Sequence, residues 1–150
     1  MLSQERIYEF AKESNEIERV YDERRHLNHA AALEKLLRLD EVTVEDLENF
    51  VDSIEPGARL RTLPSDRVWI GGSEAPPADL VSDDLPEILA DWDIVSPNRL
   101  HKQYENLHPF MDGNGRSGRA FWLWCMMKRE GYDGRFKFLQ MYYYLTLSDH

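Results

Sequence analysis

Apolar side chains recur at helical spacing along much of the chain. The first group lies three or four positions apart in residues 2–24, and its members are Ile7, Phe10, Ala11, Ile17 and Tyr21. This spacing predicts an amphipathic helix over residues 2–24. Ser14 and Glu18 lie on the same stripe. A carboxylate that faces a core is costly unless it is paired, so Glu18 either has a cationic partner elsewhere in the fold or sits at the edge of the stripe in water.

Further helices are predicted by the same spacing. The expected ranges are residues 28–39, 43–54, 82–92, 97–107, 115–130 and 135–147. Thr43 can cap its helix together with Asp46 three residues later, which is the pattern of a capping box. Ser82 is the expected N-cap of the next helix. The tyrosines at 142–144 either pack the last helix or include a site of self-modification.

Two short runs with β-strand character interrupt the helical pattern. They span residues 60–63 and 68–70, and the turn-forming sequence from Pro64 to Arg67 separates them. This arrangement predicts a hairpin within residues 60–72. Two strands alone are only marginally stable in water, so the hairpin needs a supporting surface or a binding role. The expected fold is therefore all-α with one small β-hairpin, in one domain over residues 1–150.

Composition and charge narrow the class of protein. The formal net charge of −10 argues against general affinity for nucleic acid or for an anionic membrane. Residues 99–137 nevertheless hold 8 basic and 4 acidic residues, against 10 and 23 in residues 1–98, as expected if a small anion binds there. The single Cys125 excludes an internal disulfide. With no apolar run long enough to span a bilayer and a charged N-terminus, we expect a cytoplasmic protein.

Residues 108–119, HPFMDGNGRSGR, are too polar and too rich in glycine for a packed core. A glycine-rich turn at a helix N-terminus presents backbone N–H groups to a phosphate. Arg116 and Arg119 add donors for phosphate oxygens. Asp112 is a hard oxygen ligand suited to Mg²⁺. His108 can take a proton from an attacking hydroxyl group.

Other phosphate and metal motifs fit this segment less well. Gly113, Gly115 and Gly118 match the spacing of a dinucleotide fingerprint, but no apolar strand precedes them. A Walker A loop is excluded because the chain has no Gly-Lys-Ser/Thr sequence. Zinc is not expected, since one cysteine and scattered histidines lack ligand spacing.

The same segment resembles the signature of the Fic family, His-Pro-Phe-x-Asp/Glu-Gly-Asn-Gly-Arg-x-x-Arg, at every defined position. The resemblance implies a mainly helical fold and a protein adenylyltransferase, which passes AMP from ATP to a hydroxyl side chain of a target protein. It implies that His108 is the general base and that Asp112 binds Mg²⁺. The phosphate-binding residues it implies are Gly113, Asn114, Gly115, Arg116, Gly118 and Arg119. The Doc-type branch of the family is less similar, because its motif usually has Ala and Lys around the asparagine.

Two further segments resemble parts of the same family. Residues 68–72 resemble the flap hairpin that aligns the target segment, and the flap residues implied are Leu63, Val68, Trp69, Ile70 and Gly71. Residues 14–18 resemble the inhibitory motif Ser/Thr-x-x-x-Glu-Gly/Asn, in which the glutamate pairs with the second arginine of the signature. Here those residues are Ser14, Glu18 and Arg119, and the departure is Arg19 where Gly or Asn is expected.

The sequence leaves other activities open. The same site could remove AMP from a target or transfer UMP or a phosphoryl group, and the chain could be an interaction module without catalysis. Target partners would carry a Tyr, Thr or Ser hydroxyl, with self-modification as one case, and nothing in the sequence fixes the oligomeric state.

Overall fold

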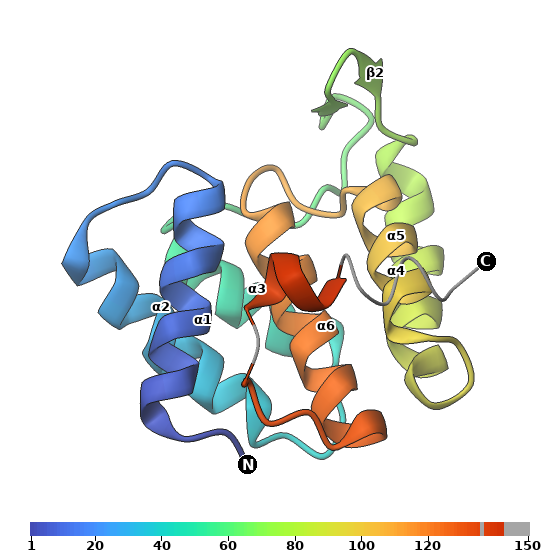
Figure 1. Ribbon diagram of the computed structural model, residues 1–150. Helices are drawn as coiled ribbons and strands as arrows, with labels where there is room; N and C mark the ends of the chain where they lie inside the picture. Colours follow the sequence, from blue (N-terminus) through green and yellow to red (C-terminus); the bar gives the residue numbers. More distant parts are fainter. Residues whose placement is uncertain (136, 143–150) are drawn as a thin grey trace.

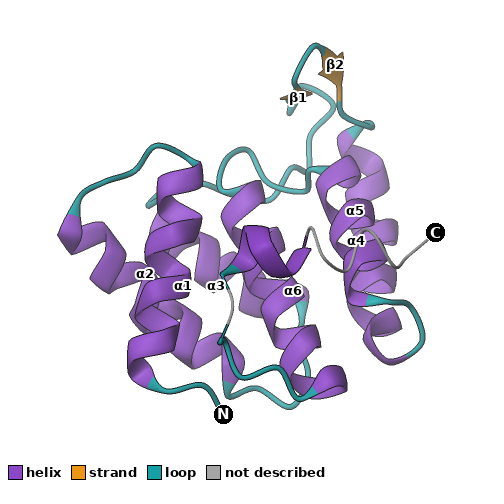
Figure 2. Cartoon of the chain, viewed as in Figure 1, coloured by secondary structure: helices purple, strands orange, loops and turns teal. Residues whose placement is uncertain are grey.

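The computed structural model describes residues 1–135 and 137–142, and it is mainly helical (Figures 1 and 2). In chain order the elements are α1 (Gln4–Ile17), α2 (Glu23–Leu37), α3 (Val44–Ile54), β1 (Trp69–Ile70), β2 (Ser73–Glu74), η1 (Ala78–Leu80), α4 (Val81–Ala90), η2 (Asp91–Asp93), α5 (Pro97–Leu107) and α6 (Asn114–Glu130). Residues 138–142 are also helical. The predicted fold class, helices with one small hairpin, is confirmed.

Helix α6 is the centre of the packing. It contacts α1, α2, α3 and α5, and in Figure 1 it lies between the α1–α3 group and the α4–α5 pair. The sequence predicts an amphipathic helix here, but the structure buries every residue from Arg116 to Met126. A helix buried on all sides belongs in the core. The loop before α6 is therefore anchored to a buried helix.

Helix α1 is shorter than the predicted helix over residues 2–24. Its last turn closes with the Arg19 N–H donating to the Glu16 carbonyl (3.0 Å) and the Val20 N–H donating to the Asn15 carbonyl (2.9 Å). These two bonds form a Schellman motif, whose C′ residue needs a left-handed backbone. Arg19 adopts that conformation with φ of 61°. The chain therefore turns directly after Glu18.

Helix α2 then begins five residues earlier than the predicted residue 28. Asp22 is its N-cap, because the Asp22 carboxylate accepts the N–H of Arg24 at 2.8 Å. Tyr21, which the stripe pattern placed in the core, lies in the preceding loop and is 67% exposed.

The two predicted caps have different outcomes. The capping box of Thr43 and Asp46 is present at the start of α3. The Ser82 prediction is wrong: α4 begins at Val81 and continues from the short helix η1, so Ser82 lies inside the helix. The Ser82 hydroxyl donates to the Asp79 carbonyl instead of capping a helix N-terminus.

The flap hairpin has a different register from the predicted one. Its strands pair Trp69 with Glu74 and Ile70 with Ser73 across the Gly71-Gly72 turn, and they project beyond α4 and α5 (Figure 1). The predicted partner strand, residues 60–63, instead places Leu60 in an isolated bridge with Phe110.

The Asp66 side chain explains why residues 60–63 do not pair with residues 68–70. Its Oδ2 atom accepts the N–H groups of Thr62 (2.9 Å) and Leu63 (3.0 Å), and the carboxylate forms two hydrogen bonds with Arg59. A side chain that satisfies the backbone in this way competes with strand pairing.

Among residues 1–135 and 137–142, no helix is long and apolar enough to cross a membrane. Tyr143 and Tyr144, and the predicted helix beyond residue 142, lie outside the described residues. The described start of that helix is held by Glu13, whose carboxylate accepts the N–H groups of Phe138 (2.7 Å) and Leu139 (3.3 Å).

Candidate active site

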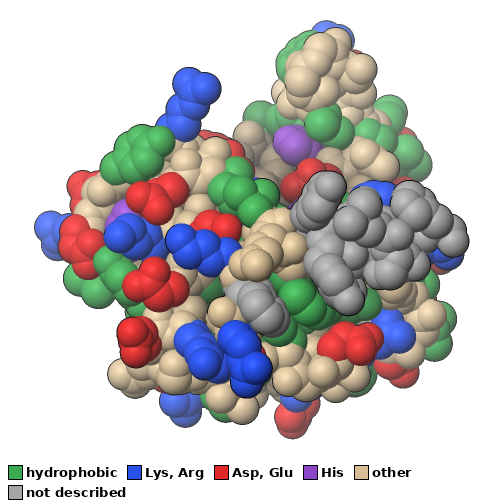
Figure 3. All heavy atoms as spheres, viewed as in Figure 1, with side chains coloured by type: hydrophobic (Ala, Val, Ile, Leu, Met, Phe, Trp, Pro, Cys, Tyr) green, Lys and Arg blue, Asp and Glu red, His purple; other side chains and the backbone are tan. Residues whose placement is uncertain are grey.

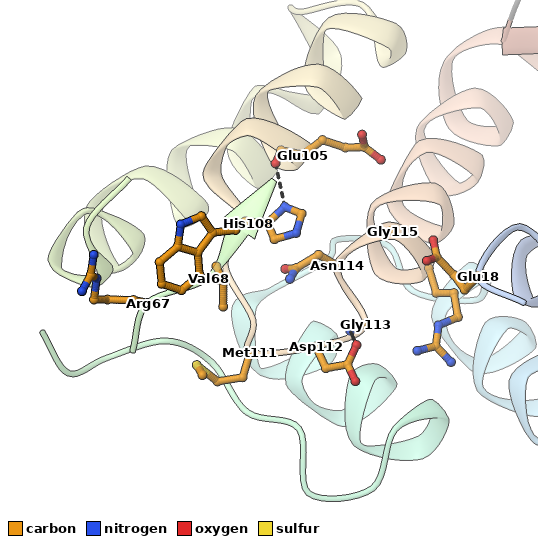
Figure 4. Close-up of a pocket in the computed structure, with 12 residues that line it drawn as sticks. Glu18, Arg67, Val68, Glu105, His108, Met111, Asp112, Gly113, Asn114 and Gly115 are labelled. Atoms are coloured by element: carbon orange, nitrogen blue, oxygen red, sulfur yellow. Dashed lines mark hydrogen bonds between the residues drawn. The ribbon is translucent and has the colours of Figure 1, made fainter. Parts of the chain in front are cut away.

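A cavity of about 560 Å³ opens between the flap, the end of α1 and the loop that precedes α6 (Figure 4). Figure 3 shows the flap standing clear of the body of the molecule beside a hollow. The cavity walls are formed by Glu18, Arg67, Val68, Trp69, Glu105, His108 and the residues from Met111 to Arg116. Most of the signature segment therefore faces one space, with the flap and Glu18 on opposite sides of it (Figure 4).

His108 lies at the C-terminal end of α5, where the helix stops. It is the C-cap residue and has a left-handed backbone with φ of 51°. The Nδ1 atom is 2.9 Å from the Glu105 carbonyl oxygen (Figure 4). Because a carbonyl only accepts, Nδ1 carries the proton and donates, which leaves Nε2 with its lone pair. That nitrogen can accept a proton from a hydroxyl group in the cavity.

The loop from Asp112 to Gly115 lies in the cavity wall, where its backbone could bind an anion. Gly113 is the N-cap of α6 and has φ of 78°, a conformation that glycine adopts readily. A Cβ at this position would also lie 3.3 Å from Val51 Cγ1. The first residues of α6 line the cavity. At a helix N-terminus the first backbone N–H groups have no partner within the helix, and the dipole end is positive. This is the geometry that binds phosphate.

Asn114 shapes this loop through both ends of its side-chain amide. Its Oδ1 accepts the Phe110 N–H (2.8 Å), and its Nδ2 donates to the Phe110 carbonyl (2.8 Å). The resemblance assigns Asn114 to phosphate binding, and the structure places it in the cavity wall with these two bonds already formed. It therefore also holds the backbone that would cradle the phosphate.

Asp112 is an exposed carboxylate on the cavity wall. Its Oδ1 accepts the Gly113 N–H at 2.7 Å, and no basic side chain in the described part of the chain pairs with it. The described residues also contain no group of three or more His, Cys, Asp or Glu that could hold a metal by themselves. Mg²⁺ commonly binds one or two carboxylates together with substrate phosphates. Asp112 beside an anion site fits that mode of binding.

Arg119 is held by the end of α1. Its Nε donates to Ser14 Oγ (2.8 Å), and its Nη2 donates to the Ser14 carbonyl (3.0 Å) and to Glu18 Oε1 (2.7 Å). The ion pair expected for Glu18 is therefore present. The Arg119 side chain is 5% exposed and that of Glu18 is 38% exposed. Glu18 thus has a cationic partner and also lies at the edge of the stripe.

The carboxylate of Glu18 lies directly over Gly115. A Cβ built on Gly115 would be 2.3 Å from Glu18 Oε1 and 3.1 Å from Arg119 Nη1. The space above the first turn of α6, where a phosphate would approach the backbone, is thus occupied by a carboxylate. The two anions cannot fill the same space, so a phosphate that contacts both Gly115 and Arg119 requires Glu18 to move.

Several expected site residues lie away from the cavity. Gly118 faces α5, where an added Cβ would lie 3.0 Å from Tyr104 Cδ1, so the position serves helix packing. In the flap, Val68 and Trp69 line the cavity, whereas Leu63, Ile70 and Gly71 do not. Ser14 and Arg119 are outside its lining as well.

Three features of the site have no signal in the sequence pattern. Arg61 is 1% exposed, and its guanidinium donates to three carbonyls, those of His108 (2.6 Å), Leu107 (2.8 Å) and Asp66 (3.1 Å). It ties the flap segment to the end of α5. Glu55, at the end of α3, accepts from Arg116 Nη2 at 3.0 Å.

The third feature is a buried polar network behind the two signature arginines. The Asn15 amide lies between His26 Nδ1 (2.9 Å) and His29 Nδ1 (2.8 Å), joining α1 to α2. Burial, followed by the charges of Arg116 and Arg119, lowers the pKa of His29 to about 3. His29 is therefore neutral at physiological pH and adds no further positive charge behind the arginines.

Comparisons with known proteins give a family match and a match to a solved structure. The model of the Fic/DOC family matches residues 33–126, well over half of the chain. Among solved structures, the fold is similar to a Fic family protein from Desulfovibrio desulfuricans G20, with a TM-score of 0.56 and 21% identity, over 83% of this chain and 48% of that one. The chain thus spans about half the length of that protein. A comparison with curated proteins gives no match.

Proposed function

Because the chain belongs to the Fic/DOC family, we propose that it transfers AMP from ATP to a hydroxyl side chain of a target protein. The observation that carries this proposal is that His108, with Nε2 free to accept, and the N-terminus of α6 face the same cavity. His108 can accept the proton of the nucleophile, and the helix N-terminus can stabilise the negative charge of the phosphates. Transfer of a phosphate-containing group requires both.

The reaction follows from these positions. His108 Nε2 accepts the proton of the target hydroxyl as its oxygen bonds to the α-phosphorus of ATP. The bond between the α-phosphorus and the bridging oxygen breaks, and pyrophosphate leaves. The Glu105 carbonyl keeps the His108 ring oriented by accepting from Nδ1. Backbone N–H groups at the start of α6 stabilise the negative charge on the phosphates.

Mg²⁺ would be held by Asp112 together with phosphate oxygens of ATP, and the charge it supplies neutralises those phosphates. Arg116 and Arg119 supply guanidinium donors of the kind that phosphates bind. The flap, whose Val68 and Trp69 line the cavity, would align an extended segment of the target by main-chain hydrogen bonding.

We further propose that Glu18 restrains this activity. It competes with a phosphate of ATP for Arg119 and for the space above Gly115. Ser14 strengthens the restraint, because its hydroxyl and carbonyl oxygens accept two more hydrogen bonds from Arg119. Movement of the end of α1 would release all three contacts together.

The experiment incubates the protein with Mg²⁺ and ATP labelled either at the α- or at the γ-phosphate. We expect Glu18→Gly to incorporate more α-label than the parent, and His108→Ala in the same background to abolish it. Glu16→Gly is the matched control, because Glu16 is exposed on the same turn of α1. Incorporation of γ-label would indicate phosphoryl transfer instead. Equal labelling of the parent and Glu18→Gly would show that Glu18 does not restrain the activity.

A further inference from the structure

Glu55 pairs with Arg116 from outside the lining of the cavity. Arg116 is among the residues that line the cavity, and Glu55 is not. Glu55 is the C-cap of α3, where its N–H donates to the Val51 carbonyl at 2.8 Å. Its Oε1 accepts from Arg116 Nη2 at 3.0 Å and also from Arg25 Nη2. One carboxylate therefore joins a guanidinium of the site to a second guanidinium on α2.

We propose that Glu55 is a positioning residue for the nucleotide: it fixes the guanidinium of Arg116 so that the remaining donors of that group are available to phosphate. This inference rests on the proposed function, in which Arg116 binds a phosphate of ATP. It assigns a role to a residue outside the signature segment, at the end of a helix that supplies no residue to the cavity wall.

Glu55 differs from Glu18 in where it meets its arginine. Glu18 lines the cavity and lies over Gly115, so it occupies space that a phosphate needs. Glu55 holds a single nitrogen of Arg116 from outside that space. The Nε and Nη1 atoms of Arg116 are buried and have no hydrogen-bond partner among the described residues. Buried donors are rarely left unsatisfied, and a bound anion is one way to satisfy them.

The charges of Arg25, Glu55 and Arg116 also indicate that Glu55 orients Arg116 and does not compete with phosphate for it. Two guanidinium groups share one carboxylate, so the cluster of Arg25, Glu55 and Arg116 retains a net positive charge. Burial alone would raise the pKa of Glu55, but the hydrogen bonds from Arg116 and then Arg25 outweigh it and lower the pKa. Glu55 is therefore ionised at neutral pH. Arg25 also donates to the Ile54 carbonyl (3.3 Å), which anchors it to the end of α3.

A fixed guanidinium matters because an arginine side chain has much rotational freedom to lose. Ordering a long side chain costs about 1.5–2 kcal/mol, and a site that orders it in advance does not spend binding energy on that step. Arg116 is 4% exposed, so its guanidinium is already desolvated before an anion arrives. Glu55 supplies the hydrogen bond that holds it in that state.

The test compares Glu55→Gln with Glu55→Met in the Glu18→Gly background, with Glu34→Gln as a control. Gln and Met are both uncharged and similar in length, but only Gln can accept a hydrogen bond from Arg116. Glu34 forms an ion pair with Arg38 on the surface of α2, away from the site. The readouts are KM and kcat for labelling from ATP, and the Kd of ATP with Mg²⁺ by calorimetry.

We expect KM and Kd for ATP to rise about tenfold in Glu55→Met and two- to threefold in Glu55→Gln, in line with the loss or weakening of a hydrogen bond to a charged group. We expect kcat to change less than threefold and Glu34→Gln to leave all three values unchanged. Equal values for the Gln and Met variants, or values below those of the background, would overturn the proposal. If Glu55→Met does not fold, Glu55→Gln alone tests the proposal. A lower KM in that variant would show that Glu55 competes with phosphate for Arg116, whereas a higher KM would support its role in positioning.

Failure of the proposed function has a different signature. If the Glu18→Gly protein shows no labelling that depends on His108, the transfer of AMP is refuted. The calorimetric comparison of the Gln and Met variants still decides the role of Glu55 in that case. If ATP does not bind to the Glu18→Gly protein at all, both proposals fall.

Discussion

Replacement of Arg19 by glycine should tighten the restraint on the site. Arg19 is the C′ residue of the Schellman motif that ends α1, and its φ of 61° is left-handed. The left-handed conformation costs an ordinary L-residue about 1–2 kcal/mol, and glycine adopts it without that penalty. Within the described residues the Arg19 side chain has no hydrogen bond or ion pair, so its removal loses no interaction of either kind. The substitution therefore favours the turn that places Glu18 over Gly115.

The magnitude follows from two opposing effects. Relief of backbone strain stabilises the closed turn by about 1–2 kcal/mol. The greater conformational freedom of glycine in the open state offsets about 0.5–1 kcal/mol of that stabilisation. The net gain of about 0.5–1 kcal/mol corresponds to a roughly two- to fivefold lower population of the released state. Activity that arises from the released state should fall by the same factor.

The assay is the initial rate of α-label incorporation by the parent, Arg19→Gly, Glu18→Gly and the double variant. We expect Arg19→Gly to label two to five times more slowly than the parent. The double variant should label at the same rate as Glu18→Gly, because without Glu18 the turn no longer places a carboxylate over Gly115. A faster or unchanged rate for Arg19→Gly would show that the left-handed turn does not hold Glu18 in place, as would a slower rate that persists when Glu18 is absent.

Other predictions concern stability, packing and the metal. The pKa of His29, about 3 in the folded protein against about 6.5 unfolded, contributes stability above pH 6.5 that is lost as the pH falls toward 3. Urea unfolding should therefore show the parent losing roughly 2 kcal/mol more than His29→Gln between pH 7 and pH 5, and equal losses would contradict this assignment. Gly118→Ala should lower the free energy of unfolding by about 1 kcal/mol, because its Cβ meets the buried Tyr104 ring, and an unchanged Tm would oppose this view. Asp112→Asn should raise the Mg²⁺ concentration needed for half-maximal labelling at least tenfold, and an unchanged titration would place the metal elsewhere.

Local signals made part of the structure predictable. Thr43 and Asp46 are three residues apart and cap each other, so their role depends on neighbours that the sequence displays. Helix α5 was predicted with its observed bounds, because Pro97 can begin a helix and the apolar spacing continues to Leu107. The polar and glycine-rich composition of residues 108–119 marked the segment as a site, and most of it lines the cavity. Its last residues, Ser117 to Arg119, are nevertheless buried in α6.

The parts that could not be predicted depend on residues that are distant in sequence or occupy unusual positions. The turn after Glu18 has Arg19 where glycine is usual, so the break between α1 and α2 has no local signal. The register of the flap depends on the Asp66 carboxylate, which binds the backbone that would otherwise pair. Arg61 gains its role only when the flap segment meets the end of α5, and Glu55 gains its role only when the end of α3 meets α2 and α6. No periodicity indicates such contacts.

In the proposed mechanism, His108 is the base for transfer of AMP and Glu18 restrains that transfer. The decisive measurement is the intact mass of the Glu18→Gly protein and of a candidate target after incubation with ATP and Mg²⁺. We predict a species heavier by one adenylyl group, on the target or on the protein itself, that is absent when His108 is replaced by alanine and scarce in the parent. An adduct with the mass of a phosphoryl group, or an adenylyl adduct that persists without His108, would contradict this mechanism.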